Sequence, residues 1–417
     1  MTAALSGGCS SPVRSGRAVG GPPFLQSRGE GAYAFDDSGR RYIDYIMAYG
    51  PLLFGHTHPA LTRGLDVLAA RGFVYGSTHA EEERLARRIS GIMPAMESIR
   101  FVTTGTEAVM SALRVARAYT QRSAVLKFAG NYHGHFDLAL LQAGASARTS
   151  DPAGAGIPSS ACVDVLIARY NDLSSVDALL EERAADLAAI VVEPIAANMG
   201  YVAPQAGFLA GLAQRARDCG ALLVYDEVVT GLRLGRGGAQ AWCGVAPDLT
   251  TIGKVLGGGV AIAAFGGRRP VMGVLAPSGP TFCGGTHAGN PFSVGMAHRV
   301  LDLLEEHPEY YEHLNTLGER LARGLREVLA HRRLPYAVVQ HGSIVDFKFR
   351  QGGAAQNYDD IESCDPKRYA AYYREMRLRG VLLPPSQNEV MFLSTAHRCE
   401  DVDRTIEAAN DSLGAIC

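Results

Sequence analysis

Short apolar runs alternate with amphipathic stretches between about residues 80 and 270. Glu107–Tyr119 and Gly207–Cys219 have helical periodicity, because apolar side chains recur every three or four residues on one face. The apolar runs between such helices predict strands at Ile99–Thr103, Ala124–Phe128, Ala189–Val192, Leu222–Tyr225, Leu249–Ile252 and Ala261–Phe265. This alternation predicts an α/β fold with a doubly wound, mostly parallel sheet, whose ligands bind at the carboxyl ends of the strands.

The two ends of the chain follow different patterns. Residues 1–30 are rich in Gly, Ser and Pro and predict an irregular arm, and apolar alternation on both sides of Asp-Asp-Ser-Gly predicts a hairpin over residues 32–48. After about Arg299 the sequence changes to charged helices and then strands, which we place at Val300–Glu306, Leu314–Arg332, Ala337–Arg350 and Val390–Ser394.

These changes of pattern predict three parts. An N-terminal arm and hairpin over residues 1–50 should pack on the small domain, residues 51–299 should form the large α/β domain, and residues 300–417 should form a smaller α+β domain. Residues 141–160 are rich in Gly, Ala and Ser and too long for an ordinary connection. They predict either a disordered insertion or a lid over a site, and the aromatic–histidine cluster just before them favours the lid.

Composition narrows the classes of function. Lys+Arg number 40 against 42 Asp+Glu, so the chain lacks the basic excess of a dedicated nucleic-acid binder and must bind a charged small ligand through local charges. No stretch is apolar and long enough for a signal peptide or a membrane span. Eight cysteines without a CxxC pair are typical of reduced thiols, so we expect a cytoplasmic protein.

Lysine occurs only at positions 127, 254, 348 and 367, so chemistry that needs an amine has four candidates. Lys254 follows the predicted strand Leu249–Ile252 and lies among glycines, which permit unusual backbone angles and close packing. A desolvated lysine can form a Schiff base with a carbonyl. The alternative is a surface lysine on a glycine-rich turn, and no Walker A pattern surrounds it.

Asp226 ends the apolar run Leu222–Tyr225 and is expected at the same sheet edge as Lys254. A carboxylate opposite a lysine-bound aromatic aldehyde is what pyridoxal phosphate requires, because the acid keeps the pyridine nitrogen protonated. The alternative role for Asp226 is a helix N-cap.

Two further motifs could complete such a site. Thr103-Thr104-Gly105-Thr106 joins a strand to an amphipathic helix, and the N-terminus of a helix favours an anion such as a phosphate, although the same residues could form an ordinary cap. Asn131-Tyr132-His133-Gly134-His135 places an aromatic ring beyond the next strand, where it could stack on a flat cofactor. The HxH spacing lacks a third ligand with supporting spacing, so a metal site is the weaker interpretation, and His56 and His58 are interpreted as turn or core residues.

These residues, together with YIDY, GPLLFGHTHP, GTEA, YHGH, VVEPIAANMG, YDEVVTGLR, DLTTIGKVLGGG and GGTHAGNP, resemble the class III pyridoxal-phosphate-dependent aminotransferases over nearly the whole chain. Within that family the chain is most similar to the glutamate-1-semialdehyde 2,1-aminomutase branch. The resemblance implies fold type I, a cofactor that is pyridoxal 5′-phosphate or its pyridoxamine form, and intramolecular transfer of an amino group. It also implies a homodimer that shares the cofactor site and binds neither nucleic acid nor membrane.

The resemblance also implies roles for individual residues. Those for the cofactor are Lys254 as Schiff-base amine and proton shuttle, Asp226 at the pyridine nitrogen, Gly105, Thr106 and the partner subunit's Thr286 at the phosphate, Tyr132 and Val228 on the two ring faces, and Asn198 with Glu193 near the ring oxygen. For the substrate they are Ser11 and Arg14 at a carboxylate and Glu389 near the amino group. The 141–160 loop matches the position of a gating loop.

Some positions depart from the family pattern. Thr103 and Thr104 replace Asn-Ser, His287 and Ala288 replace Leu-Ser, Tyr49 stands where tryptophan is common, and Asn388 where phenylalanine is common. These departures leave an alternative open, in which the enzyme is a transaminase of the same family acting on another carboxylate-bearing amino or keto compound. Retention of Ser11, Arg14 and Glu389 favours the aminomutase.

Overall fold

The computed structural model describes residues 4–143 and 155–416. Their contacts divide the chain into two compact units. Unit 1 comprises residues 1–59, 197–202 and 308–417, and unit 2 comprises residues 60–196 and 203–307. Unit 1 is therefore built from three separate stretches of the sequence. Most of the predicted lid, at residues 144–154, lies outside the described residues.

Unit 2 is built around a seven-stranded sheet with the strand order β4-β10-β9-β8-β7-β5-β6. The strands are β4 (Ser98–Val102), β5 (Ala124–Phe128), β6 (Val165–Ala168), β7 (Leu187–Val192), β8 (Leu222–Glu227), β9 (Leu249–Ile252) and β10 (Ala263–Gly267). Strand β10 pairs antiparallel with both β4 and β9, whereas the other pairs are parallel. The predicted mostly parallel α/β sheet is therefore confirmed.

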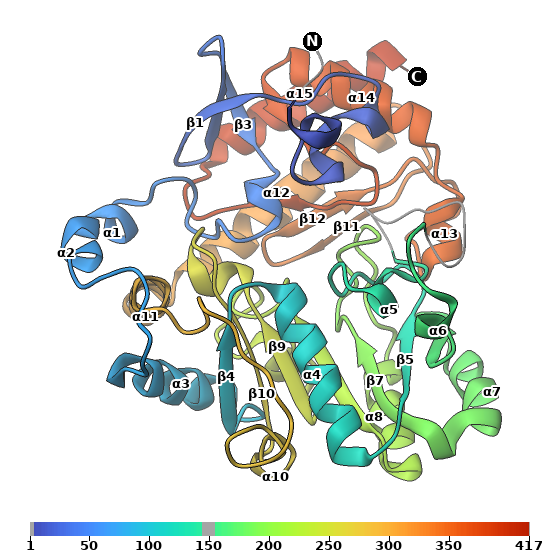
Figure 1. The fold of residues 1–417 in the computed structure, drawn as a ribbon. Coiled ribbons are helices and arrows are strands. Elements are labelled where there is room, and N and C mark those ends of the chain that lie inside the picture. The colour runs from blue at the N-terminus through green and yellow to red at the C-terminus, as the bar shows by residue number, and fades with distance from the viewer. Residues whose placement is uncertain (1–3, 144–154, 417) are drawn as a thin grey trace. The chain divides into compact units, whose positions relative to one another are not determined.

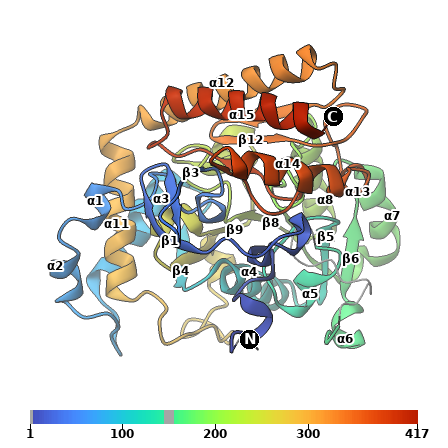
Figure 2. The same ribbon diagram turned by 90° about the horizontal axis from the view of Figure 1, so that it is seen from above.

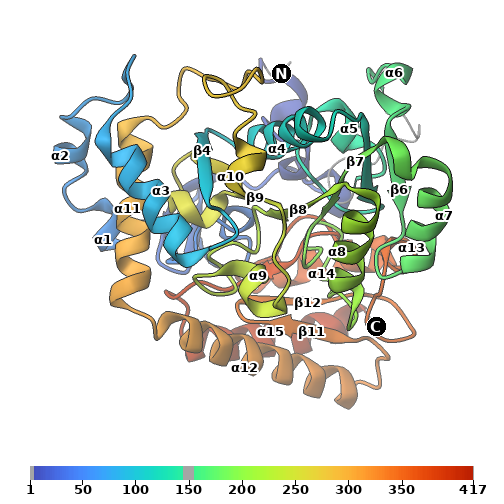
Figure 3. The same cartoon turned by 90° about the horizontal axis from the view of Figure 1, so that it is seen from below.

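Helices cover both faces of this sheet, as in a doubly wound fold. Helix α4 (Gly105–Thr120) and helix α8 (Phe208–Cys219) lie on opposite faces (Figures 1 and 3). Every residue of β5, β7 and β8 is buried, which agrees with their largely apolar sequences; the charged exceptions are Lys127 in β5 and Asp226-Glu227 at the end of β8. The other α-helices between residues 59 and 307 are α1 (Pro59–Thr62), α2 (Leu65–Ala69), α3 (Ala80–Ile92), α5 (Asp137–Leu140), α6 (Ser159–Cys162), α7 (Leu173–Arg183), α9 (Gly238–Cys243), α10 (Arg269–Met272) and α11 (Pro291–Glu306).

Unit 1 contains two small sheets. One has the order β1-β2-β3-β13 and the other β11-β12-β14. Their strands are β1 (Gln26–Glu30), β2 (Tyr33–Asp36), β3 (Arg41–Asp44), β13 (Val381–Leu382), β11 (Val338–His341), β12 (Ile344–Phe347) and β14 (Met391–Phe392). The antiparallel pair β2–β3 confirms the predicted hairpin.

The longer part of unit 1 contains the α-helices α12 (Tyr310–His331), α13 (Tyr358–Glu362), α14 (Pro366–Leu378) and α15 (Cys399–Ile416). Figure 2 shows α12, α15 and α14 side by side. One expectation was wrong here, because the strand predicted over Ala337–Arg350 is two antiparallel strands, β11 and β12. The chain reverses at Gly342, whose φ of 53° lies in the left-handed region that glycine adopts readily. Within residues 4–143 and 155–416, no helix is long and apolar enough to cross a membrane.

Candidate functional site

The register of two neighbouring strands sets the positions of Asp226 and Lys254. Strands β8 and β9 are parallel, and Asp226 at the end of β8 lies beside Thr251 of β9. Lys254 follows the last residue of β9 by two positions and begins a short 3-10 turn, Lys254–Gly257. Both residues therefore lie at the carboxyl edge of the sheet, as predicted. The φ of Lys254 is 44°, a left-handed conformation that costs free energy for a residue with a Cβ and is often found at functional sites.

The Asp226 carboxylate is buried and held from three directions. The Nδ1 atom of His133 lies 2.7 Å from Oδ2, the Thr251 hydroxyl donates to Oδ1 at 3.2 Å, and the backbone N–H of Val228 donates to Oδ1 at 3.1 Å. Asp226 is only 5% exposed and His133 only 2%. These three contacts hold the carboxylate in one orientation at the sheet edge.

The other three lysines have surroundings different from those of Lys254. Lys127 is completely buried, and its Nζ donates to the carbonyl oxygens of Ala139 and Leu141 at 2.8 and 2.6 Å. Lys348 forms a buried ion pair with Asp346 at 2.8 Å. Lys367 is exposed in the first turn of α14. Lys254 is thus the amine that unit 2 offers beside Asp226.

Helix α4 begins at the same sheet edge. Thr104 caps it: its hydroxyl accepts the N–H of Glu107 at 3.2 Å, while the Glu107 carboxylate accepts the N–H groups of Thr103 and Thr104 at 2.9 and 2.8 Å. The cap and the predicted anion site coexist, because the N–H groups of the first turn have no acceptor within the helix. The Thr106 hydroxyl lies 3.3 Å from Nδ1 of His135.

Gly105, the first residue of α4, places no side chain at the start of the helix. A Cβ at this position would lie 2.9 Å from Cγ1 of Val228, closer than real Cβ contacts, so a larger residue would displace Val228. The loop after β5 supplies Tyr132, which is half-buried and whose backbone N–H donates to Glu193 Oε1 at 2.8 Å. The backbone N–H of Glu193 donates in turn to the Asn131 side chain at 3.1 Å. Thr286 lies in the exposed stretch of residues 284–287.

These residues of unit 2 fit pyridoxal phosphate. A buried acid held by hydrogen bonds suits a protonated pyridine nitrogen, a lysine two residues past the adjacent strand supplies the amine, and a helix N-terminus suits a phosphate. The two histidines of the HxH motif are engaged with Asp226 and Thr106. Within the described ranges, no cluster of three or more His, Cys, Asp or Glu residues could hold a metal ion.

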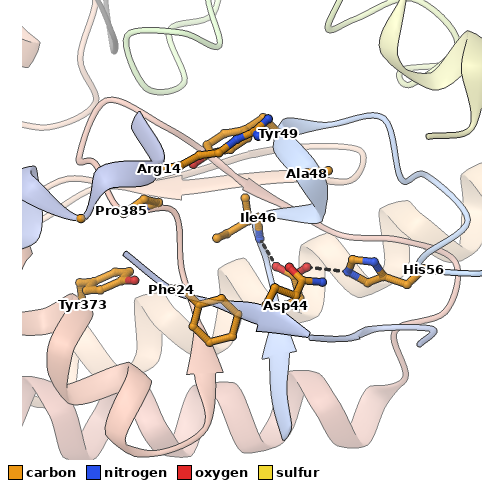
Figure 4. A pocket seen from close by; sticks show the side chains of 11 residues that line it. Arg14, Phe24, Asp44, Ile46, Ala48, Tyr49, His56, Tyr373 and Pro385 are labelled. Carbon is orange, nitrogen blue, oxygen red and sulfur yellow. Dashed lines mark hydrogen bonds and ion pairs between the residues drawn. The ribbon is translucent and has the colours of Figure 1, made fainter. Parts of the chain in front are cut away.

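Four of the predicted site residues belong to unit 1: Ser11, Arg14, Asn198 and Glu389. The Ser11 carbonyl accepts the N–H of Arg14 at 3.0 Å; Arg14 lies in the 3-10 turn Pro12–Ser15, and Ser11 is the residue just before it. Arg14 and Tyr49 line a cavity of about 370 Å³, drawn in Figure 4. At its other side the buried Asp44 accepts a hydrogen bond from His56 at 2.8 Å, so His56 is held in a structural pair.

Tyr49 interacts electrostatically with two charged residues of unit 1, Arg14 and Glu389. Burial raises the pKa of its hydroxyl, the nearby Glu389 carboxylate raises it further, and the Arg14 guanidinium opposes both. Tyr49 therefore lies within electrostatic reach of two predicted substrate residues. Met47, Ala48 and Tyr49 have φ values of 44°, 54° and 65°, so three successive residues with side chains adopt the left-handed conformation.

Sequence reasoning missed the residues that hold Asp226. The sequence indicates His133 only as a possible metal ligand and gives no role to Thr251, yet both bond the carboxylate. Thr251 could have been found, because parallel pairing of two predicted strands places it beside Asp226. His133 could not, since the path of the loop after β5 depends on tertiary packing.

The chain is similar to known proteins along nearly all of its length. Residues 15–411 match the family model described as aminotransferase class-III. A protein named glutamate-1-semialdehyde 2,1-aminomutase from Thermomicrobium roseum is 47% identical over 98% of this chain and 95% of its own length. A protein of the same name from Thermus thermophilus is 45% identical over 98% of this chain and 96% of its own length.

Solved structures agree. An omega-transaminase from Sphaerobacter thermophilus superposes with a TM-score of 0.87 at 29% identity, covering 95% of this chain and 92% of the other. A glutamate-1-semialdehyde aminomutase from Pseudomonas aeruginosa in complex with PMP superposes with a TM-score of 0.83 at 26% identity, covering 95% of this chain and 88% of the other. With the family model matching almost the whole chain and the sheet edge arranged as described, this chain belongs to the class III aminotransferases.

Proposed function

We propose that this enzyme uses pyridoxal phosphate and its pyridoxamine form to move an amino group within one molecule, converting glutamate 1-semialdehyde to 5-aminolevulinate. The observation that carries the cofactor proposal is the pairing of β8 with β9, which places the buried Asp226 and the amine of Lys254 at one sheet edge. The substrate proposal rests on the aminomutases that are similar over nearly their full length.

In this proposal each site residue of unit 2 has a defined role. Bound pyridoxal phosphate supplies an electron sink for the electrons of a broken C–H bond. Asp226 keeps the ring nitrogen protonated, with His133 and Thr251 orienting its carboxylate. Lys254 Nζ would carry a proton between the substrate carbon and the bound cofactor.

Other residues bind and orient the ligand. The N–H groups at Gly105 and Thr106 bind the phosphate, and Tyr132 and Val228 contact the two faces of the ring. Glu193 and Asn198 act near its ring oxygen. Arg14, with Ser11, binds the substrate carboxylate through a charge-assisted hydrogen bond, and Glu389 attracts the substrate amino group. The overall reaction consumes no external amino donor, because carbon C1 of glutamate 1-semialdehyde gains one nitrogen and carbon C2 loses one.

We further propose a cytoplasmic homodimer in which Thr286 reaches the partner's phosphate site. Apolar side chains on the surface of unit 2 support this assembly: Phe73 is 63% exposed and Phe282 is 77% exposed, with the partly exposed Val74 and Tyr75 beside Phe73. Burying such side chains in an interface removes apolar area from water. Thr286 lies four residues from Phe282 in an exposed stretch, where a second copy could cover it.

The experiment is to incubate purified enzyme, loaded with the pyridoxamine form, with glutamate 1-semialdehyde and no other amino compound. We expect 5-aminolevulinate to accumulate over many turnovers, and Lys254→Ala to abolish it. Borohydride reduction of the pyridoxal form should label Lys254, as peptide mapping would show. Absence of 5-aminolevulinate, with labelling of Lys254 intact, would reject the substrate while keeping the cofactor.

One observation favours a second candidate, a transaminase acting between two compounds. Asn388 is only 4% exposed, and its Oδ1 has no hydrogen-bond partner among the described residues. A buried acceptor without a donor is costly and suits a ligand that brings an N–H or O–H group. A screen of amino donors that convert the pyridoxal form to the pyridoxamine form decides between the two: a donor that supports multiple turnovers with a separate acceptor would establish the transaminase.

A further inference from the structure

A buried ion pair lies at the end of strand β12 in unit 1: Asp346 belongs to the strand, and Lys348 directly follows its last residue. Asp346 and Lys348 are two residues apart, so both side chains project from the same face of the extended chain. The Lys348 ammonium lies 2.8 Å from Asp346 Oδ1, and the two residues are 8% and 4% exposed respectively. The intervening Phe347 belongs to the opposite, apolar face. Alternation of this kind ordinarily puts the charged face in water, whereas here it is covered.

Two loops cover this pair, and each is bonded to it. The Asp346 Oδ2 atom accepts the backbone N–H of Tyr201 at 3.0 Å. The Lys348 Nζ donates to the backbone carbonyl of Glu389 at 3.3 Å. A third bond joins the loops directly, since the N–H of Gly200 donates to the Asn388 carbonyl. The pair thus fixes the backbone at residues 200–201 and at residue 389.

The loop of residues 197–202 also rests on the lysine stem. A Cβ at Gly200 would lie 2.4 Å from Lys348 Cε, and the φ of Gly200 is 83°. Only glycine combines that backbone conformation with so close an approach. The loop therefore adopts its path because Lys348 lies under it and Asp346 captures the next N–H group.

A buried ion pair is a weak source of stability, because desolvation of both charges offsets their attraction. Burial raises the pKa of the Asp346 carboxyl, and the Lys348 charge opposes that shift. The hydrogen bonds from the pair to two separate loops point instead to a role in geometry. Asn198 lies two residues before Gly200, and Glu389 provides the carbonyl that Lys348 bonds.

We propose that Asp346 and Lys348 are positioning residues: through their hydrogen bonds to Tyr201 and Glu389 they set where Asn198 and Glu389 lie within unit 1. The inference rests on the proposed function for the roles of Asn198 and Glu389. It adds two residues that act through the backbone of two loops.

Two double variants of the full enzyme separate geometry from charge. In Asp346→Asn with Lys348→Gln, the charges disappear but an amide oxygen can still accept the Tyr201 N–H, and an amide N–H can still donate to Glu389. In Asp346→Leu with Lys348→Met, the volume stays filled and both hydrogen bonds are lost. Apolar replacement of a buried ion pair commonly preserves folding. A matched control, Arg320→Gln with Asp403→Asn, removes a more exposed ion pair of the same unit, between α12 and α15.

The first readout is the pair of steady-state constants with glutamate 1-semialdehyde. The Leu/Met variant should raise KM by at least ~10-fold, as expected for loss of hydrogen bonds that involve charged groups, with borohydride labelling of Lys254 unchanged. The Asn/Gln variant should restore KM to within about threefold of wild type, and the control should leave it unchanged. Equal KM values in the two double variants would overturn the proposal.

The second readout does not depend on activity. Hydrogen exchange of peptides covering residues 197–202 and 386–390 should be faster by at least ~10-fold in the Leu/Met variant and near wild type in the Asn/Gln variant. If wild-type enzyme makes no 5-aminolevulinate, the proposed function fails and this measurement alone decides on the pair. Unchanged exchange in the Leu/Met variant would overturn the positioning role whatever the substrate.

Discussion

The two units hold their candidate functional residues in different ways. In unit 2, Asp226, Lys254 and the start of α4 lie at strand and helix ends, so the register of a buried parallel sheet sets their positions. In unit 1, Arg14 lies in a short 3-10 turn, and Glu389 lies in a loop bonded to Lys348. Backbone pairing positions the first group and individual side chains position the second.

This difference suggests how each group responds to substitution. A sheet edge is held by many backbone hydrogen bonds, so replacing one side chain there should remove its chemistry without moving its neighbours. A loop is held by a few side-chain bonds, so a replacement there can shift the whole loop. We therefore expect changes in unit 2 to lower kcat and changes in unit 1 to raise KM.

The largest effect should follow from Lys254→Arg. A guanidinium stays protonated and can neither condense with an aldehyde nor accept a proton, so kcat should fall by at least ~10³-fold. Single-turnover kinetics and borohydride labelling measure this loss. Lys367→Arg, on the surface of α14, is the matched control and should have no effect. Turnover that survives at a tenth of the wild-type rate would assign the amine chemistry to another group.

Asp226→Asn tests whether the charge or only the shape of the acid matters. An amide can keep part of the hydrogen-bond set, but it does not hold a proton on the ring nitrogen, so kcat should fall ~10²–10³-fold with little change in KM. Asp248→Asn is the control, because Asp248 lies beside the amino end of β9, at the opposite edge of the sheet. A change in KM with kcat retained would contradict the role of Asp226.

His397 should make unit 1 sensitive to acid. Burial lowers its pKa to about 4, below the ordinary value of 6.5, and its Nδ1 accepts the N–H of Ser394 at 3.1 Å. As pH falls from 6.5 to 4, the unfolded chain binds the proton first, so the free energy of unfolding should drop by about 3 kcal/mol across that window. Urea unfolding at pH 7 and pH 4.5 measures the drop.

The matched variant is His397→Asn, whose Oδ1 can accept the same N–H without titrating. Its free energy of unfolding should lack this part of the pH dependence, and both proteins should respond alike above pH 7. An identical loss in the two proteins between pH 6.5 and 4 would mean that other groups cause the acid sensitivity.

Arg14→Gln should affect affinity alone. Loss of a charge-assisted hydrogen bond to a carboxylate is expected to raise KM about 10- to 100-fold while kcat changes less. Arg17→Gln, an exposed residue on the same arm, is the control. A fall in kcat at unchanged KM would remove the contrast between the units, because it would place Arg14 in the chemical step.

The smallest effect should come from the helix cap at the sheet edge. Thr104→Ala removes the acceptor for the Glu107 N–H and should lower the free energy of unfolding by about 1 kcal/mol. Thr120→Ala is the matched control, since its hydroxyl only bonds back to Ala116 in the last turn of α4. A large rise in the dissociation constant of the cofactor would show that Thr104 serves the phosphate directly.

Local pattern predicted most of the large sheet. The prediction of strands at Ala124–Phe128 and Leu249–Ile252 is correct to the residue, because each is a short run rich in apolar and β-branched side chains. Strand β6 was missed, since its four residues follow an irregular, Gly-rich region. The sequence predicts one strand where the structure has the hairpin of β11 and β12. Both strands have a β-like pattern, and only the short turn at Gly342 separates them.

The site was predictable where it depends on strand ends and unpredictable where it depends on tertiary contacts. Asp226 and Lys254 follow apolar strands, so their shared edge could be inferred from the chain alone. The partner of Asp226, His133, comes from a loop 93 residues away in sequence. Asp346 and Lys348 alternate with apolar residues as a half-exposed strand would, and only the loops that cover them reveal their burial.

The division of the chain into units has a consequence for exchanging segments with relatives. Residues 197–202 belong to unit 1, although they lie within the sequence span that otherwise builds unit 2. A chimera that takes residues 60–307 from a relative would therefore place a foreign loop over Asp346 and Lys348. The relative that supplies these residues must carry glycine at position 200. Otherwise the chimera should lose the hydrogen bond from the Tyr201 N–H to Asp346, even if the sheets of both units stay intact.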